Sequence, residues 1–243
     1  MNRIALLLTL VLASTAGAER YQDAVNHPGR PAVDREDDDR RKPAEVMAFA
    51  GVSSGNIVID IGAGGGYTTE LAARLVGAKG KVYAQGLDPA RVIGNRLPNV
   101  ISLPRHLLFE LGMRLDKAGL QKGSADCVLA FFTLHDMYLN TDIDKQRLYR
   151  TLISFLKPGG NFIVLDNTAR EGSGLADTPA LHRIDPEFLK EDILKAGFEF
   201  AGKYDALRNP QDDLQSSWNR DTETRARGYH DRFAFRFRKP IAD

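Results

Sequence analysis

The stretch NIVIDIGAGGGYTTELAARL, residues 56–75, joins an apolar run, a glycine-rich turn and a helical pattern. The apolar run contains Asp60, residues 62–66 are glycine except for Ala63, and the helical pattern starts at Tyr67. In an open α/β sheet, ligands bind where the strands end, and glycine lets a ligand approach the bare backbone. We therefore expect residues 56–61 to form a buried strand and residues 62–66 to hold a ligand.

The glycine spacing excludes two common ligands of such turns. A dinucleotide-binding turn has the pattern G-x-G-x-x-G, but counting from Gly62 and Gly64 places Tyr67 at the third glycine. A phosphate-binding P-loop needs a lysine followed by serine or threonine after its last glycine, and none is present. The pattern that fits is Asp60-x-Gly62-x-Gly64-x-Gly66.

Strand-like and helix-like segments alternate along the rest of the chain. Near-continuous apolar strands alternating with amphipathic helices predict a doubly wound, mostly parallel sheet with helices on both faces. The last two strand-like segments lack a helix between them and predict an antiparallel hairpin at one edge. The expected strands are residues 56–61, 80–86, 99–103, 126–134, 161–166, 198–207 and 231–240. The expected helices are residues 43–51, 67–77, 89–97, 106–115, 143–156 and 186–197.

The first 18 residues have the features of a secretory signal peptide. A polar start with Arg3 precedes the apolar run Ile4 to Ala13, and the small residues Ala16-Gly17-Ala18 follow. This run is too short to span a bilayer, which takes about 20 residues. We expect cleavage after Ala18 and export, most simply to a periplasm.

The net charge and the cysteine count argue against several classes of partner and linkage. The formal net charge is +1, which gives no general attraction to nucleic acid or to anionic membranes. Cys127 is the single cysteine, so an internal disulfide is impossible, and no other segment is apolar enough to span a membrane. Residues 19–42 form a polar arm, interpreted as solvated, with a lid over the site as the alternative. Residues 43–243 are expected to form one domain that acts on a small molecule, and nothing specifies its oligomeric state.

The turn Asp60-x-Gly62-x-Gly64-x-Gly66 resembles the first motif of class I S-adenosylmethionine-dependent methyltransferases. Two further stretches, FLKPGGNFIVLD at 155–166 and KAGFEF at 195–200, resemble the entries to that family's fifth and sixth strands. The resemblance implies S-adenosylmethionine as cofactor and a Rossmann-like sheet of seven strands with a reversed last strand. More narrowly, TLHDMY and GSGLADTPALHRID resemble a subgroup of predicted methyltransferases that carry a signal peptide. The cofactor-binding residues that the resemblance implies in the first turn are Asp60, Gly62, Ala63, Gly64, Gly66 and Tyr67.

The sequence departs from that family at the end of the second strand. Members usually place an acid there for the ribose hydroxyls, and Gly86 stands at this position. Gln85 could accept the ribose hydrogen bond as a neutral substitute, and Asp88 could reach it one turn later. Because a charged acceptor makes the stronger hydrogen bond, the substitution predicts weaker cofactor binding.

A second group of polar residues follows the fourth and fifth strands. The carboxyl ends of parallel strands share one edge of the sheet, so His135 and Asp136 are expected near Asp166 and the loop with His182 and Arg183. Either histidine is a candidate base, Asp166 would orient a histidine or an amine acceptor, and Arg183 would grip an anionic substrate. In the alternative interpretation, His135-Asp136 only closes the strand and His182-Arg183 only builds the loop.

Three functions are compatible with these residues. The first is methyl transfer to a small-molecule acceptor, which must be reconciled with export because S-adenosylmethionine is made in the cytosol. The second is an exported ligand-binding protein on the same fold that does not methylate. The third is a metal-dependent hydrolase or lyase that uses His135, Asp136, Asp166 and His182, although no H-x-x-H or H-x-H spacing assigns a metal.

Overall fold

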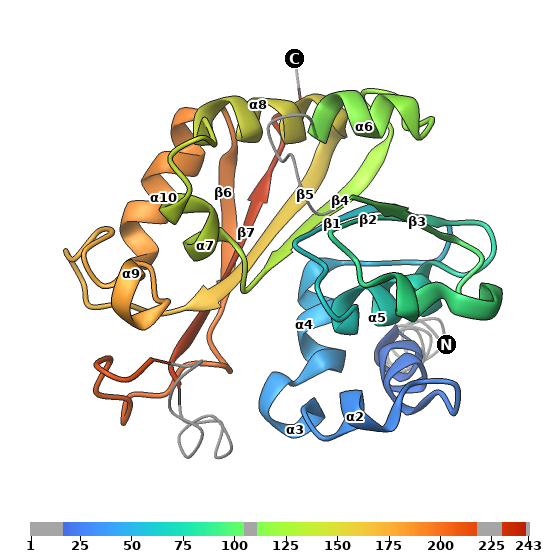
Figure 1. The fold of residues 1–243 in the computed structure, drawn as a ribbon, viewed down its shortest axis with the longest axis horizontal. Coiled ribbons are helices and arrows are strands. Elements are labelled where there is room, and N and C mark those ends of the chain that lie inside the picture. The colour runs from blue at the N-terminus through green and yellow to red at the C-terminus, as the bar shows by residue number, and fades with distance from the viewer. Residues whose placement is uncertain (1–16, 105–110, 218–229, 242–243) are drawn as a thin grey trace, which may run out of the picture.

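The computed structural model describes residues 17–104, 111–217 and 230–241. A seven-stranded sheet in the order β3-β2-β1-β4-β5-β7-β6 runs through the molecule (Figure 1). Its strands are β1 (Ile57–Ile61), β2 (Lys81–Gln85), β3 (Val100–Leu103), β4 (Ala125–Phe131), β5 (Leu156–Asn167), β6 (Glu199–Tyr204) and β7 (Arg232–Arg238).

Helices surround the sheet, and they include short ones before Pro43, after β4 and after β5 that the sequence did not predict. The first helical segment covers residues 17–26. The others are α2 (Ala32–Arg35), α3 (Asp38–Arg41), α4 (Pro43–Ala50), α5 (Tyr67–Val76), the 3-10 helix η1 (Pro89–Asn95), α6 (Leu111–Lys117), α7 (Leu134–Leu139), α8 (Lys145–Phe155), α9 (Thr178–Leu181) and α10 (Pro186–Lys195). The expected helix at 106–115 is confirmed for α6, and its first part lies outside the described residues.

Strand pairing confirms the doubly wound fold with a reversed last strand. β1 pairs in parallel with β2 and β4, and β4 pairs in parallel with β5. β7 is antiparallel to both β5 and β6, and it lies between them, so β6 forms the edge. The carboxyl ends of β1, β4 and β5 therefore meet at one rim, beside the start of β7.

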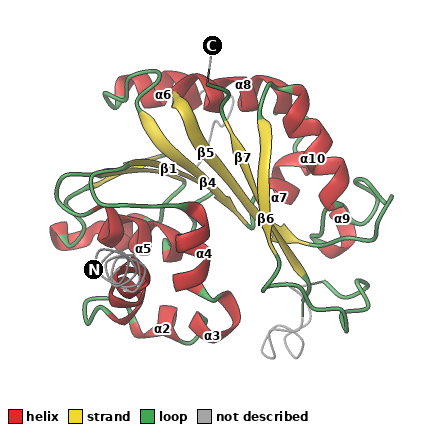
Figure 2. Cartoon of the chain, turned by 180° about the vertical axis from the view of Figure 1, so that it is seen from behind, coloured by secondary structure: helices red, strands yellow, loops and turns green. Residues whose placement is uncertain are grey.

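Two apolar layers hold the sheet between helices. Successive residues of a strand point to opposite faces, so Val58 belongs to the core under α4 and α5, while Ile59 belongs to the core under α6, α8 and α10. Figure 2 shows these two groups of helices on opposite sides of the sheet. Because both faces are covered, the buried part of the strands is mostly apolar. The buried polar residues of the strands therefore require a reason; they are Asp60, Gln85, Asp166, Asn167 and Arg232.

The N-terminal part of the chain comprises the expected signal peptide, residues 1–18, and the polar arm, residues 19–42. Residues 1–16 of the expected signal peptide lie outside the described residues. Residues 19–42 were expected to be solvated, and this expectation is wrong, because they fold into short helices that pack beside α5 (Figure 1). Tyr21 and Val25 are buried against that side of the sheet. In the part of the chain that the structure describes, no helix is long and apolar enough to cross a membrane.

Candidate functional site

The glycine turn adopts a backbone conformation that other residues rarely take. Gly62, Gly64 and Gly66 have φ values of 68°, 51° and 80°. A Cβ on Gly62 would lie 2.1 Å from the Thr133 hydroxyl oxygen, so this glycine is also required for the contact between β1 and the end of β4. The turn is closed by Asp88, whose backbone N–H donates to the Gly64 carbonyl at 2.8 Å.

Two cavities meet at this turn. The main cavity, about 390 Å³, is lined by the turn, the N-terminal arm and the ends of β4, β5 and β7. The second cavity, about 730 Å³, is lined by the ends of β2 and β3. Gly64 and Gly65 line both, and a Cβ on Gly65 would meet nothing within 4 Å. This open backbone fits a nucleoside amino acid laid across the turn, with its amino-acid part in the main cavity and its nucleoside in the second.

Of the two residues expected to replace the missing ribose acid, Gln85 and Asp88, only Asp88 lines a cavity. Gln85 is buried, its side-chain oxygen accepts from the Gly62 N–H at 3.0 Å, and its amide donates to the Pro104 carbonyl at 3.5 Å. The expected ribose contact of Gln85 is therefore wrong, because its side chain braces the turn. Asp88 is exposed and lines the second cavity, so it is the carboxylate available to ribose hydroxyls there, although one oxygen already accepts from the Ala90 N–H.

Asp60 lies beneath the turn with its carboxyl group almost entirely removed from water. It is 1% exposed, and its Oδ2 accepts a hydrogen bond from the Thr69 hydroxyl at 2.5 Å. Burial raises the pKa of Asp60 to about 7, and the Thr69 hydrogen bond opposes this only in part. Asp60 also lines the main cavity.

The raised pKa of Asp60 predicts that the protein loses stability with rising pH. The folded chain keeps a proton that the unfolded chain releases, so the stabilisation is complete below about pH 4 and is lost as the pH rises through about 7. The loss is on the order of 4 kcal/mol, at about 1.36 kcal/mol per pKa unit. Asp60→Asn should remove this decline in urea unfolding series at about pH 5 and about pH 8, whereas Glu171→Gln at an exposed carboxylate should not. An unchanged decline in Asp60→Asn would assign the pH dependence to another group.

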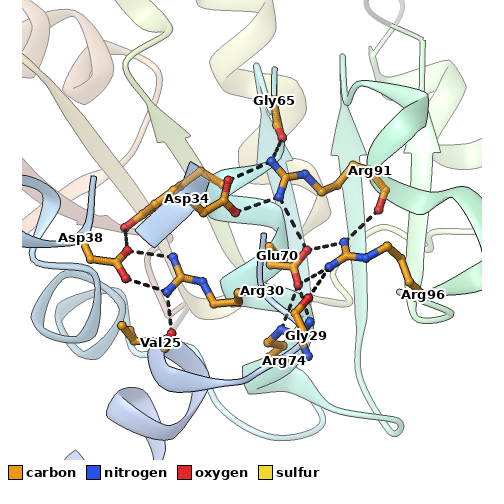
Figure 3. A network of polar contacts seen from close by, with 11 residues as sticks. Val25, Gly29, Arg30, Asp34, Asp38, Gly65, Glu70, Arg74, Arg91 and Arg96 are labelled. Atoms are coloured by element: carbon orange, nitrogen blue, oxygen red, sulfur yellow. Dashed lines mark hydrogen bonds and ion pairs between the residues drawn. The ribbon is translucent and has the colours of Figure 1, made fainter. Parts of the chain in front are cut away.

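The N-terminal arm forms one wall of the main cavity, as the lid interpretation anticipated. Figure 3 shows Arg91 between the carboxylate of Asp34 and the carbonyl of Gly65, so the arm is tied directly to the turn. A second tie joins Asp38 to the Tyr67 hydroxyl at 2.6 Å and to Arg30 at 2.8 Å. Tyr67 thus lines the cavity while its hydroxyl anchors the arm.

The rim expected from the sequence is assembled on the α7 and α9 side. The fully buried Nδ1 of His135 lies 2.6 Å from Asp166, which also accepts from two backbone N–H groups there. Asp136 is exposed, and its Oδ1 lies 3.0 Å from Nδ1 of His182 and 3.3 Å from Nε2 of His135. A carboxylate can only accept, so the Nδ1 of each histidine carries its proton.

His135 lies between two carboxylates that stabilise its protonated form. Burial lowers the pKa of His135, but the charge and hydrogen bond of Asp166, with the charge of Asp136, raise it above the ordinary value overall. His135, Asp136 and His182 place one donor atom each within 4.8 Å of one another, a spacing that could hold a metal ion. The buried Nε2 of His135 has no hydrogen-bond partner among the described residues and lies 3.3 Å from Asp136.

Arg183 does not serve the role predicted for it. Its side chain is fully buried, and its guanidinium pairs with the equally buried Asp212 at 2.8 Å. It also donates to the carbonyls of Thr168 and Ser216. The expectation that Arg183 grips an anionic substrate is therefore wrong, because the guanidinium ties the loop after β5 to Asp212 and Ser216 and to its own residue Thr168.

The main cavity contains residues that the sequence did not single out. Asn167 and Arg232 face each other across the β5–β7 pair, and both line the cavity together with Phe132 and Arg41. His230 is buried and also lines it. The Asn167 amide lies 3.5 Å from the His182 carbonyl, so Asn167 links the cavity to the rim, whose histidines do not line it. Phe132, directly after β4, has a φ of +54°, which is rare for a residue other than glycine and which the sequence did not predict.

Comparison with known proteins agrees with this geometry. Residues 59–164 match the family model of the methyltransferase domain. This part of the chain is thus similar to the methyltransferase domain of S-adenosylmethionine-dependent enzymes. The matched residues include the whole glycine turn and most of β5, and S-adenosylmethionine is the cofactor of this class, which the open backbone at Gly65 fits.

Individual relatives are distant. The ubiquinone/menaquinone biosynthesis C-methyltransferase UbiE of Pseudomonas paraeruginosa is 29% identical over 130 residues, which cover 50% of this chain and 45% of that protein. The chain thus spans about half the length of the curated relatives it matches. A methyltransferase from Aquifex aeolicus superimposes with a TM-score of 0.56 at 18% identity, covering 84% of this chain and 90% of that one. The [4+2]-cyclase SpnF gives 0.57 at 19% identity, covering 84% and 81%. These two structures show the fold alone.

Proposed function

We propose that this protein transfers the methyl group of S-adenosylmethionine to an oxygen or nitrogen atom of a small-molecule acceptor. The observation that carries the proposal is the open Gly64–Gly65 backbone shared by two cavities, one of which extends to the ends of β5 and β7. The relatives named as C-methyltransferases support a small-molecule acceptor, although they cover only half of this chain.

Different residues of the chain would bind the cofactor and the acceptor and remove the acceptor's proton. S-adenosylmethionine brings a methyl group already activated by a sulfonium, so an enzyme of this class mainly positions the acceptor and removes its proton. The glycine turn and Asp88 would hold the cofactor, and Asn167 would contact the acceptor. The arm would exclude water, because Arg91 and Asp34 fix it against the turn.

We assign the base to His182. Its Nδ1 proton is engaged by Asp136, which leaves Nε2 as the basic nitrogen. His135 is fully buried and held by Asp166, so it positions Asp136 and does not touch the acceptor. Asn167 lines the main cavity and its amide contacts the His182 carbonyl, so an oxygen or nitrogen acceptor that reaches past Asn167 from the cavity would pass its proton to Nε2 of His182.

His182→Gln is expected to lower product formation roughly 100-fold, the lower end of the usual contribution of a general base. Glutamine keeps a hydrogen bond to Asp136 but cannot take a proton at neutral pH. Purified protein would be incubated with S-adenosylmethionine that carries a trideuterated methyl group and with small-molecule extracts, and labelled products would be counted by mass spectrometry. His27→Gln, at an exposed histidine that lines neither cavity, serves as control. Full activity of His182→Gln would remove His182 from the mechanism.

The same experiment tests the function itself. Labelled products that require intact protein support methyl transfer. A protein that binds neither S-adenosylmethionine nor S-adenosylhomocysteine in calorimetry, and forms no labelled product, would instead fit the non-methylating ligand-binding alternative.

We further propose that the protein is exported, on the strength of the signal-like residues 1–18. Methylation would then use S-adenosylmethionine available outside the cytosol or would precede export. Fractionation with mass spectrometry of the N-terminus tests this. A chain that begins at Glu19 in the exported fraction supports export, and full-length chain confined to the cytosol overturns it.

A further inference from the structure

Most arginines next to the main cavity are neutralised by a carboxylate. Figure 3 shows these pairs on the arm side: Arg30 with Asp38, and Arg91 with Asp34. Behind them, the buried Glu70 pairs with two arginines of α5 and the segment after η1. These positive charges are therefore committed to the fold.

Of three other arginines at this cavity, two share a single acid and the third pairs with none among the described residues. Arg40 and Arg41 both pair with Asp37, at 2.6 Å and 3.0 Å. Arg232 takes part in none of the ion pairs between described residues, although it is 4% exposed. A nearly buried guanidinium without a counter-ion is costly, which makes its environment informative.

The contacts of Arg232 leave part of its guanidinium unsatisfied. Its Nη1 donates to the Arg40 carbonyl at 2.9 Å, and its Nε has no hydrogen-bond partner. Burial, with the charges of Arg40 and Arg41, lowers the pKa of Arg232 to about 10. Excess positive charge thus gathers at this wall of the cavity, and an anion would relieve it.

Arg232 lies on the acceptor side of the cavity and away from the turn. It is the first residue of β7 and is the register partner of Asn167 at the end of β5. Along the sheet, β1 is separated from β7 by β4 and β5. Three strand spacings amount to roughly 14 Å, so the anion near Arg232 is distinct from an amino-acid carboxylate held at the glycine turn.

The surroundings also specify an apolar part of the ligand. The guanidinium of Arg232 lies over the Phe132 ring at 5.3 Å, and that of Arg41 lies over the same ring at 5.5 Å. Phe131 lines the cavity beside them. An acid attached to a planar or apolar group would pair with Arg232 and pack on these rings.

We propose that Arg232 binds the acidic group of the methyl acceptor, a small molecule that carries a carboxylate or phosphate next to an apolar part. This assignment rests on the proposed function and names its substrate class.

The test uses benzoate, with benzamide as its uncharged analogue of the same shape, and inorganic phosphate. Each is titrated by calorimetry into the full chain saturated with S-adenosylhomocysteine. We expect benzoate or phosphate to bind and benzamide to bind at least tenfold more weakly. Arg232→Gln should weaken anion binding roughly 10- to 100-fold, the usual range for charged hydrogen bonds.

Arg236→Gln is the matched control. Arg236 lies on the same strand, has an Nε without a partner and stacks over Phe49 at 4.5 Å, but it does not line the cavity. The Arg236→Gln variant should bind anions with the same affinity as the wild type. If Arg232→Gln fails to fold, the Nε–H resonance of Arg232 in the wild type should shift with benzoate and not with benzamide.

Three results would overturn the assignment. They are anion binding that Arg232→Gln leaves unchanged, equal effects of Arg232→Gln and Arg236→Gln, and anions that bind only by displacing S-adenosylhomocysteine. Failure of the proposed function is separable from these results, because it would appear as absent binding of S-adenosylhomocysteine. The anion titrations in the absence of that ligand would still report on Arg232.

Discussion

Gly65→Val is expected to weaken S-adenosylmethionine binding at least about 100-fold, because overpacking a filled site costs about 3 kcal/mol. Gly65 lines both cavities, and a Cβ there meets no protein atom within 4 Å. Its φ lies outside the left-handed region, so a side chain causes no backbone strain. The added isopropyl group therefore fills only the space that the cofactor needs. Calorimetric titration with S-adenosylmethionine and S-adenosylhomocysteine measures the effect, and the melting temperature should stay unchanged.

Two other glycine variants distinguish a loss of ligand affinity from a loss of stability. Gly65→Ala adds a single methyl group and should give a smaller loss of affinity with the same melting temperature. Gly62→Ala should instead lower the melting temperature, because its Cβ would collide with Thr133 and its φ is 68°. Wild-type affinity in Gly65→Val would mean that the ligand does not lie across this turn.

The features that sequence predicted well are those fixed by local pattern. The buried strand and glycine turn around Asp60 follow from an apolar run and glycine spacing, and both are confirmed. The approach of His135 to Asp166 followed from topology, since β4 and β5 are neighbouring parallel strands. The expected strand bound at Leu134 is wrong, because β4 ends at Phe131 and His135 lies in the first turn of α7. Asp185 stands directly before Pro186, a local pattern typical of a helix start, and its carboxylate accepts from the Glu187 and Phe188 N–H groups at the start of α10.

The features that sequence did not predict depend on side-chain direction and on distant partners. Gln85 ends its strand at the right edge, but its side chain turns toward the Gly62 N–H and away from the cavities. The N-terminal arm carries a charge pattern typical of a solvated segment, and its acids are matched by arginines such as Arg91, 57 residues away. Arg232 faces the cavity because β7 returns antiparallel beside β5, a pairing that no local pattern specifies.

Asp212→Asn is expected to lower the free energy of unfolding by about 3–5 kcal/mol, the usual cost of breaking a buried ion pair. Asp212 and Arg183 both have fully buried side chains and form two hydrogen bonds, at 2.8 Å and 3.1 Å. Asparagine is similar in size, so the variant chiefly removes the charge and leaves the Arg183 guanidinium uncompensated. Urea unfolding followed by circular dichroism measures the loss.

The neighbouring residue supplies the control. Asp213 is exposed and only accepts from the Gln215 N–H, so Asp213→Asn should change the free energy of unfolding by no more than about 0.5 kcal/mol. A double variant, Arg183→Met with Asp212→Leu, should recover part of the stability lost in Asp212→Asn, because apolar residues of similar volume avoid the buried charge. Equal stability of Asp212→Asn and Asp213→Asn would contradict this role of the pair. The loop that carries His182 would then have to be held in place by other contacts, and Arg183 would again be available to a ligand.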